Sequence, residues 1–145
     1  METAHLRERY ATFCSQCRDH MAHASAVLDD NRPAEATTLA MLRWQYVRLL
    51  TEFDAFKNRE IFASALWEEV PEKAALAREL QVACTEMGHA FRAYVLKWST
   101  VDKSVHWDEY HAAANAIIKR LHGHFEREGP LIERLLADPP KPTDN

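Results

Sequence analysis

The chain has 145 residues, of which 47% are hydrophobic, and its 18 basic and 22 acidic residues give a net charge of −4. This length fits one domain with a substantial core, and the acidic balance without a stripe of Lys and Arg excludes the usual electrostatic footprint of a nucleic-acid-binding protein. No apolar run approaches the roughly 20 residues that cross a bilayer, the charged N-terminus lacks the pattern of a secretory signal, and three cysteines fit a reducing cytoplasm better than a disulfide framework.

Apolar residues recur at helical spacing along nearly the whole chain, which predicts an all-α protein. Long helices are expected over about 3–28, 33–67, 71–98 and 104–137. Pro33 and Pro71 suit first helical turns, and Ser104 is a plausible N-cap. Similar lengths and short connections predict an up-down-up-down antiparallel four-helix bundle over residues 1–137. The Pro-rich tail, residues 138–145, cannot continue a helix and is expected to be disordered.

Ionisable residues interrupt two of the predicted apolar helix faces. His124 and Glu128 fall within the stripe of the fourth helix, and Glu60 falls within the stripe of the second. Burying such groups is costly unless they are paired or bind a metal. Aligning the helices at their turns brings these three residues to one level of the bundle. Two interpretations follow: a non-haem iron site, since imidazole and carboxylate suit iron, or a Glu60–His124 ion pair without metal.

The fourth helix, residues 107–132, resembles the last helix of hemerythrin-like (HHE cation-binding) domains. Those bundles place His-x-x-x-Glu on the second and fourth helices, and single histidines on the first and third. Residues 53–62 look like the second-helix motif, with Glu60 in the carboxylate place and Phe56 where histidine is expected. The resemblance implies non-haem iron as cofactor, and binding or sensing of O2 or NO, or iron handling. No set of residues indicates nucleophilic or hydride chemistry, which favours a binding protein over an enzyme. The metal ligands that the resemblance implies are His124, Glu128, Glu60 and His20.

The ligand set is nevertheless incomplete. His20 lies on the apolar stripe of the first helix, but alignment by level brings His5 or Tyr10 nearer to Glu60. On the third helix, His89 falls opposite the apolar stripe and is expected to face solvent. A mononuclear, weak or vestigial metal site is therefore one hypothesis. The other is a metal-free helical-bundle interaction or regulatory module in which Phe56 and its neighbours replace the ligands.

Three further features carry weaker expectations. Cys14, Cys17, His20 and His23 are soft ligands at steps of three, but they do not all share one helix face, so ordinary helical positions are the default. Pro130 is expected to kink or break the fourth helix just after Glu128. Large rings near helix ends plug a bundle by default, or mediate contacts in a homodimer. The residues concerned are Trp44, Trp67, Trp98 and Trp107.

Overall fold

The chain is nearly all helix. In the computed structural model, which describes residues 2–137, the protein is 90% helical and those residues form no strand, so the all-α prediction is confirmed. The predicted disorder of 138–145 concerns residues outside the described part. The elements are α1 (Glu2–Asp29), η1 (Pro33–Glu35), α2 (Ala36–Phe56), η2 (Lys57–Phe62), α3 (Ala63–Trp67), α4 (Pro71–Thr100) and α5 (Trp107–Leu136).

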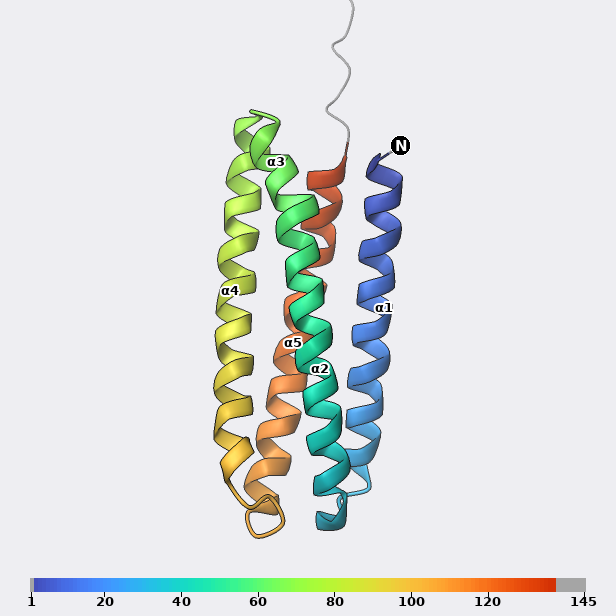
Figure 1. The fold of residues 1–145 in the computed structure, drawn as a ribbon, viewed down its shortest axis with the longest axis vertical. Helices are drawn as coiled ribbons and strands as arrows, with labels where there is room; N and C mark the ends of the chain where they lie inside the picture. Colours follow the sequence, from blue (N-terminus) through green and yellow to red (C-terminus); the bar gives the residue numbers. More distant parts are fainter. Residues whose placement is uncertain (1, 138–145) are drawn as a thin grey trace, which may run out of the picture.

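The elements α2, η2 and α3 follow one another without a break and make one long rod. Figure 1 shows this rod beside α1, α4 and α5, with the α1–α2 and α4–α5 connections at one end and the α3–α4 connection at the other. The most extensive packing joins α4 with α5, α1 with α2, and α1 with α5. None of the helices within residues 2–137 combines the length and the apolar content needed to span a membrane.

Prolines and local side-chain hydrogen bonds define the connections between the helices. Pro33 and Pro71 stand at the first turns of η1 and α4, as predicted. The connection before α5 differs from the prediction, because Asp102 Oδ1 accepts hydrogen bonds from the backbone N–H of Ser104 (3.0 Å) and from its hydroxyl (2.6 Å). Ser104 is thereby held in a turn, and α5 begins two residues later than a Ser104 cap would require.

The end of the molecule near the α1–α2 turn has its own apolar cluster. Trp98 and Trp107 are buried there, and the Trp107 indole N–H donates to Asn31 Oδ1 at 2.9 Å. These two rings plug the interior, as predicted by default. Trp44 and Trp67 do not, since they are 51% and 84% exposed.

Helix α5 runs through Pro130 to Leu136. The expectation of a broken helix is therefore wrong. Pro130 is exposed, and so is Glu126, whose carbonyl would accept the missing hydrogen bond in a regular helix. Water can solvate that carbonyl, which explains why the helix continues.

Candidate functional site

A single carboxylate lies at the centre of the candidate site. Glu128, on α5, is 2% exposed. Its Oε2 accepts a hydrogen bond from the Tyr10 hydroxyl of α1 at 2.7 Å. Its Oε1 accepts one from Lys57 Nζ at 2.9 Å and one from the Cys84 thiol of α4 at 3.1 Å. Glu128 thus joins side chains from all four rods.

Lys57 is the cation that neutralises this carboxylate, and its side chain is only 1% exposed. Besides Glu128, its ammonium contacts Asp54 Oδ1 at 3.4 Å and Cys84 Sγ at 3.4 Å. These three contacts match the three donors of an ammonium group. The same Nζ lies 4.3 Å from the centre of the Phe53 ring, a favourable cation–π position.

His124 forms the remaining wall of the site. It is 7% exposed, and its Nε2 lies 3.4 Å from Glu128 Oε1, one helical turn away on α5. The same nitrogen lies 4.0 Å from Cys84 Sγ. The ring meets Phe125 edge-on at a centroid distance of 5.2 Å. The imidazole is therefore in contact with both the Glu128 carboxylate and the Phe125 ring.

The pKa values of these groups follow from burial and from the Lys57–Glu128 pair. Burial alone would raise the pKa of Glu128, but hydrogen bonding with His124, the Lys57 charge and the Tyr10 hydroxyl lower it to about 2. Burial alone would lower the pKa of Lys57, but the charge and hydrogen bond of Glu128, together with Cys84 and Asp54, outweigh it and raise that pKa. Burial raises the pKa of Cys84 to about 12. At neutral pH the site therefore holds a carboxylate, an ammonium and a protonated thiol.

The structure brings together two of the four predicted metal ligands, His124 and Glu128. It does not bring Glu60 to them, because Glu60 is exposed, and the prediction that it lies in the core is wrong. The cause is the π-helical turn η2, which accommodates one residue more than an α-helical turn. Phe56 and Lys57 both face inward, Glu60 faces outward, and Ile61 returns to the core. The Glu60–His124 ion pair is consequently replaced by a Lys57–Glu128 pair.

Of the candidate ligands on the first helix, one belongs to the site and the others lie away from it. His20 is half-buried, bonds the Leu42 carbonyl through Nε2 at 2.6 Å and stacks on Tyr46, away from the cluster. His5 is exposed, whereas Tyr10 belongs to the cluster through Glu128 rather than through Glu60. His89 is exposed, as predicted.

Sequence reasoning missed Lys57 and Cys84. A signal for both was present, because each lies four residues after a core position, Phe53 and Leu80 respectively. A buried Glu128 also required a cation from a facing helix. Searching the apolar stripes for a Lys or Arg would have found Lys57.

The donor set permits a test of whether a divalent metal fits. One donor atom each from Cys84, His124 and Glu128 lie within 4.8 Å of one another, as metal ligands would. However, Lys57 Nζ lies within 3.4 Å of both the Cys84 sulfur and a Glu128 oxygen. A metal ion bound to these two atoms would stand against a buried positive charge. The residues therefore do not fit a resident iron while Lys57 keeps this position.

Fold and site together define an all-α protein with a buried Lys–Glu pair at its centre. Comparison with protein-family models, with curated proteins and with solved structures gives no match for this chain.

Proposed function

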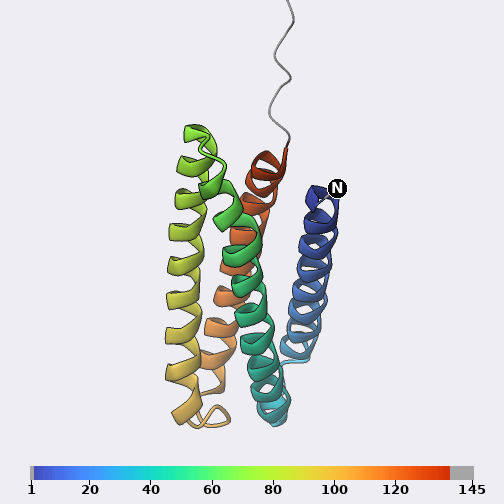
Figure 2. The same ribbon diagram turned by 45° about the horizontal axis from the view of Figure 1, so that its top comes forward.

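We propose that the chain is a hemerythrin-like, up-down-up-down antiparallel four-helix bundle that acts as a metal-free binding or regulatory module in the cytoplasm. The observation that carries this proposal is the Lys57 ammonium, 2.9 Å from Glu128 and almost completely buried. It supplies the positive charge that a metal ion would supply in a hemerythrin-like centre. The bundle is supported by Figure 2, in which the long helices remain side by side in the turned view.

The chemistry of the site supports binding rather than catalysis. Lys57 and Cys84 are the groups that could act as nucleophiles, and both pKa values are raised, so both stay protonated at neutral pH. Tyr10, Lys57 and Cys84 also all donate their hydrogen bonds to the Glu128 carboxylate. Such a closed network fixes the register of the four rods, because every rod contributes one partner.

Metal analysis tests this function. We expect protein purified from iron-supplemented cells to contain no stoichiometric transition metal, and added Fe(II) to leave its melting temperature unchanged. Elemental analysis and thermal melts under nitrogen measure this. One bound iron per chain in the wild type, lost in His124→Ala, would overturn the proposal.

The second candidate function is non-haem iron binding, with O2 or NO as the gaseous ligand. The convergence of Cys84, His124 and Glu128 favours it. It requires Lys57 to leave the site. The variant Lys57→Ala separates the two functions. If the protein is metal-free, only this variant takes up Co(II), which is seen as a thiolate-to-cobalt absorption band. If the protein binds iron, the wild type takes up Co(II) as well.

A homodimer is a further proposal, supported by the exposed indoles of Trp44 and Trp67. Sedimentation of the wild type against Trp44→Ala and Trp67→Ala tests it. A wild type that remains monomeric at high concentration contradicts it.

A further inference from the structure

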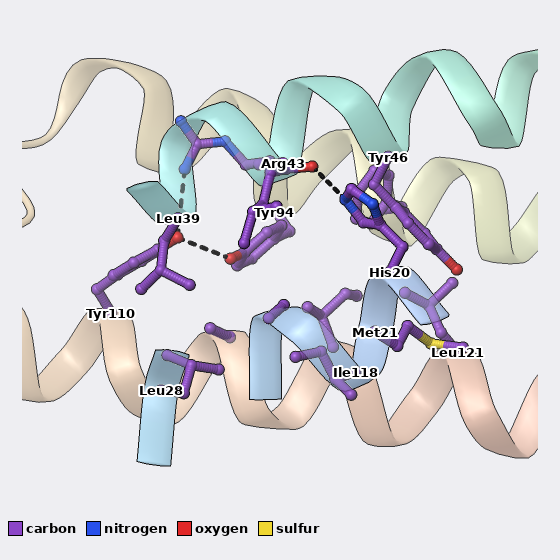
Figure 3. A pocket seen from close by; sticks show the side chains of 15 residues that line it. His20, Met21, Leu28, Leu39, Arg43, Tyr46, Tyr94, Tyr110, Ile118 and Leu121 are labelled. Carbon is purple, nitrogen blue, oxygen red and sulfur yellow. Dashed lines mark hydrogen bonds between the residues drawn. The ribbon is translucent and has the colours of Figure 1, made fainter. Parts of the chain in front are cut away.

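A second polar feature lies in the part of the bundle nearer to the α1–α2 turn. A cavity of about 50 Å³ is lined there by side chains from α1, α2, α4 and α5. Its walls are mostly apolar, and they include Leu28, Leu39, Leu42, Phe91 and Ile118. Figure 3 shows these walls together with a polar end, where the Tyr110 hydroxyl stands between Arg43 and Tyr94.

Arg43 lines this cavity and is 6% exposed. No carboxylate oxygen of residues 3–137 lies within ion-pair distance of it. Within that part of the chain its guanidinium makes one long hydrogen bond, from an Nη to the Tyr110 hydroxyl at 3.5 Å, while its buried Nε–H has no partner. An uncompensated buried charge is costly, and the fully paired Lys57 shows how this chain satisfies one elsewhere.

A second cation, Lys103, lies close enough to Arg43 to feel its charge. The pKa of Lys103 is lowered, first by burial and then by the Arg43 charge. Hydroxyl groups complete the polar end, because the Tyr94 hydroxyl donates to that of Tyr110 at 3.3 Å. Elsewhere on the cavity wall, the buried Tyr46 hydroxyl has no hydrogen-bond partner among residues 3–137 either. The cavity thus offers donors and positive charge without an acceptor that is negatively charged.

We propose that this cavity binds a small organic monocarboxylate, with its carboxylate on Arg43 and Tyr110 and its apolar end among the leucines. A planar guanidinium binds a carboxylate through two parallel hydrogen bonds. One cation matches one negative charge, and the apolar walls match a hydrocarbon end. A water needs about 10–15 Å³ of such volume, so the cavity holds about three to five heavy atoms, the size of acetate or propionate. The proposal names a ligand for the binding module proposed above, and it is independent of whether Lys57 or a metal neutralises Glu128.

Calorimetry and thermal melts with sodium propionate, against sodium chloride at equal ionic strength, test the proposal. We expect one propionate per chain and a melting temperature that rises with propionate but not with chloride. Arg43→Met keeps the unbranched apolar stem of the side chain but removes the guanidinium and its charge, and should weaken propionate binding at least tenfold. Tyr110→Phe should weaken it several-fold. Arg48→Met, an exposed position on the same helix, should bind like the wild type.

Two results would overturn the proposal: stabilisation by propionate no greater than by chloride, or unchanged propionate affinity in Arg43→Met. If Arg43→Met does not fold, Arg43→Lys keeps the charge but loses the planar fork and should bind propionate more weakly; unchanged affinity there also overturns the proposal. Iron found in the wild type would count against the metal-free function alone. Propionate binding depends on Arg43 and Tyr110, which are not among the candidate metal ligands.

Discussion

Glu128 depends on partners from other rods, and the loss of any one of them has a large expected effect. We expect Lys57→Met to lower the free energy of unfolding by about 3–5 kcal/mol, because it leaves the Glu128 charge buried and uncompensated. Urea unfolding followed by circular dichroism measures the change.

The exposed pair between Arg7 and Glu133 provides a matched control. Its side chains are 41% and 60% exposed, so Arg7→Met should cost less than about 1 kcal/mol. Adding Glu128→Gln to Lys57→Met should recover part of the loss, because the remaining charge is removed while an acceptor for Tyr10 is kept. Equal losses for Lys57→Met and Arg7→Met would show that the buried pair contributes no more than a surface pair.

The same carboxylate makes stability depend on acid. The pKa of Glu128 is about 2 in the folded protein, below the ordinary value of a glutamate. The unfolded state therefore binds a proton more readily, so stability is full above about pH 4.5 and falls as the pH drops towards 2. Glu128→Gln should flatten this acid limb of the melting-temperature profile. A limb of unchanged slope in that variant would assign the acid sensitivity to other carboxylates.

At the scale of the helix, Pro130 costs stability without breaking α5. Pro130→Ala restores a backbone N–H and should raise the free energy of unfolding by about 2 kcal/mol, the cost of an interior proline less its effect on the unfolded chain. Pro71→Ala is the control, because Pro71 stands in the first turn of α4, where its missing N–H costs nothing. Urea unfolding compares the two variants, and a Pro130→Ala variant no more stable than the wild type contradicts the expectation.

The helices themselves follow from patterns that are local in sequence. Apolar spacing and the positions of Pro33 and Pro71 were enough to predict helices close to their observed bounds. The start of α5 was displaced by the side-chain turn at Asp102, a competition between local hydrogen bonds that the apolar pattern does not contain. The prediction of an all-α chain did not depend on this detail.

Of the four predicted metal ligands, only His124 and Glu128 lie in the site, and the reason for the misplacement of Glu60 lies in one element, η2. His124 and Glu128 were found because α5 keeps regular spacing across them. Glu60 was misplaced because the prediction assumed the same regular spacing through residues 57–62, where the helix is of the π type. A π turn has no strong sequence signature. That Lys57 rather than Glu60 points into the core could therefore be recognised only by asking which cation neutralises Glu128.

For the molecule as a whole, the three cysteines report how readily the bundle opens. Cys17 and Cys84 are buried and their pKa values are raised to about 12, whereas Cys14 is only half-buried. We expect a thiol reagent at neutral pH to modify Cys14 first, and to reach Cys17 and Cys84 only at the rate at which the bundle unfolds. Mass spectrometry of a labelling time course, with and without urea, measures this order. Early modification of Cys84 would show that the centre of the bundle opens on its own.

The extra residue in η2 has a consequence for how such a centre can change over generations. A π turn holds one residue more than an α-helical turn, so the loss of one codon within 57–62 would let this turn become α-helical while the residues on either side keep their present faces. Such a deletion would redistribute only the side chains of the turn itself, Lys57 among them, between the interior and the surface. A lineage carrying this fold could therefore lose or gain the cation at its centre through a change in chain length alone, without repacking the rest of the rod.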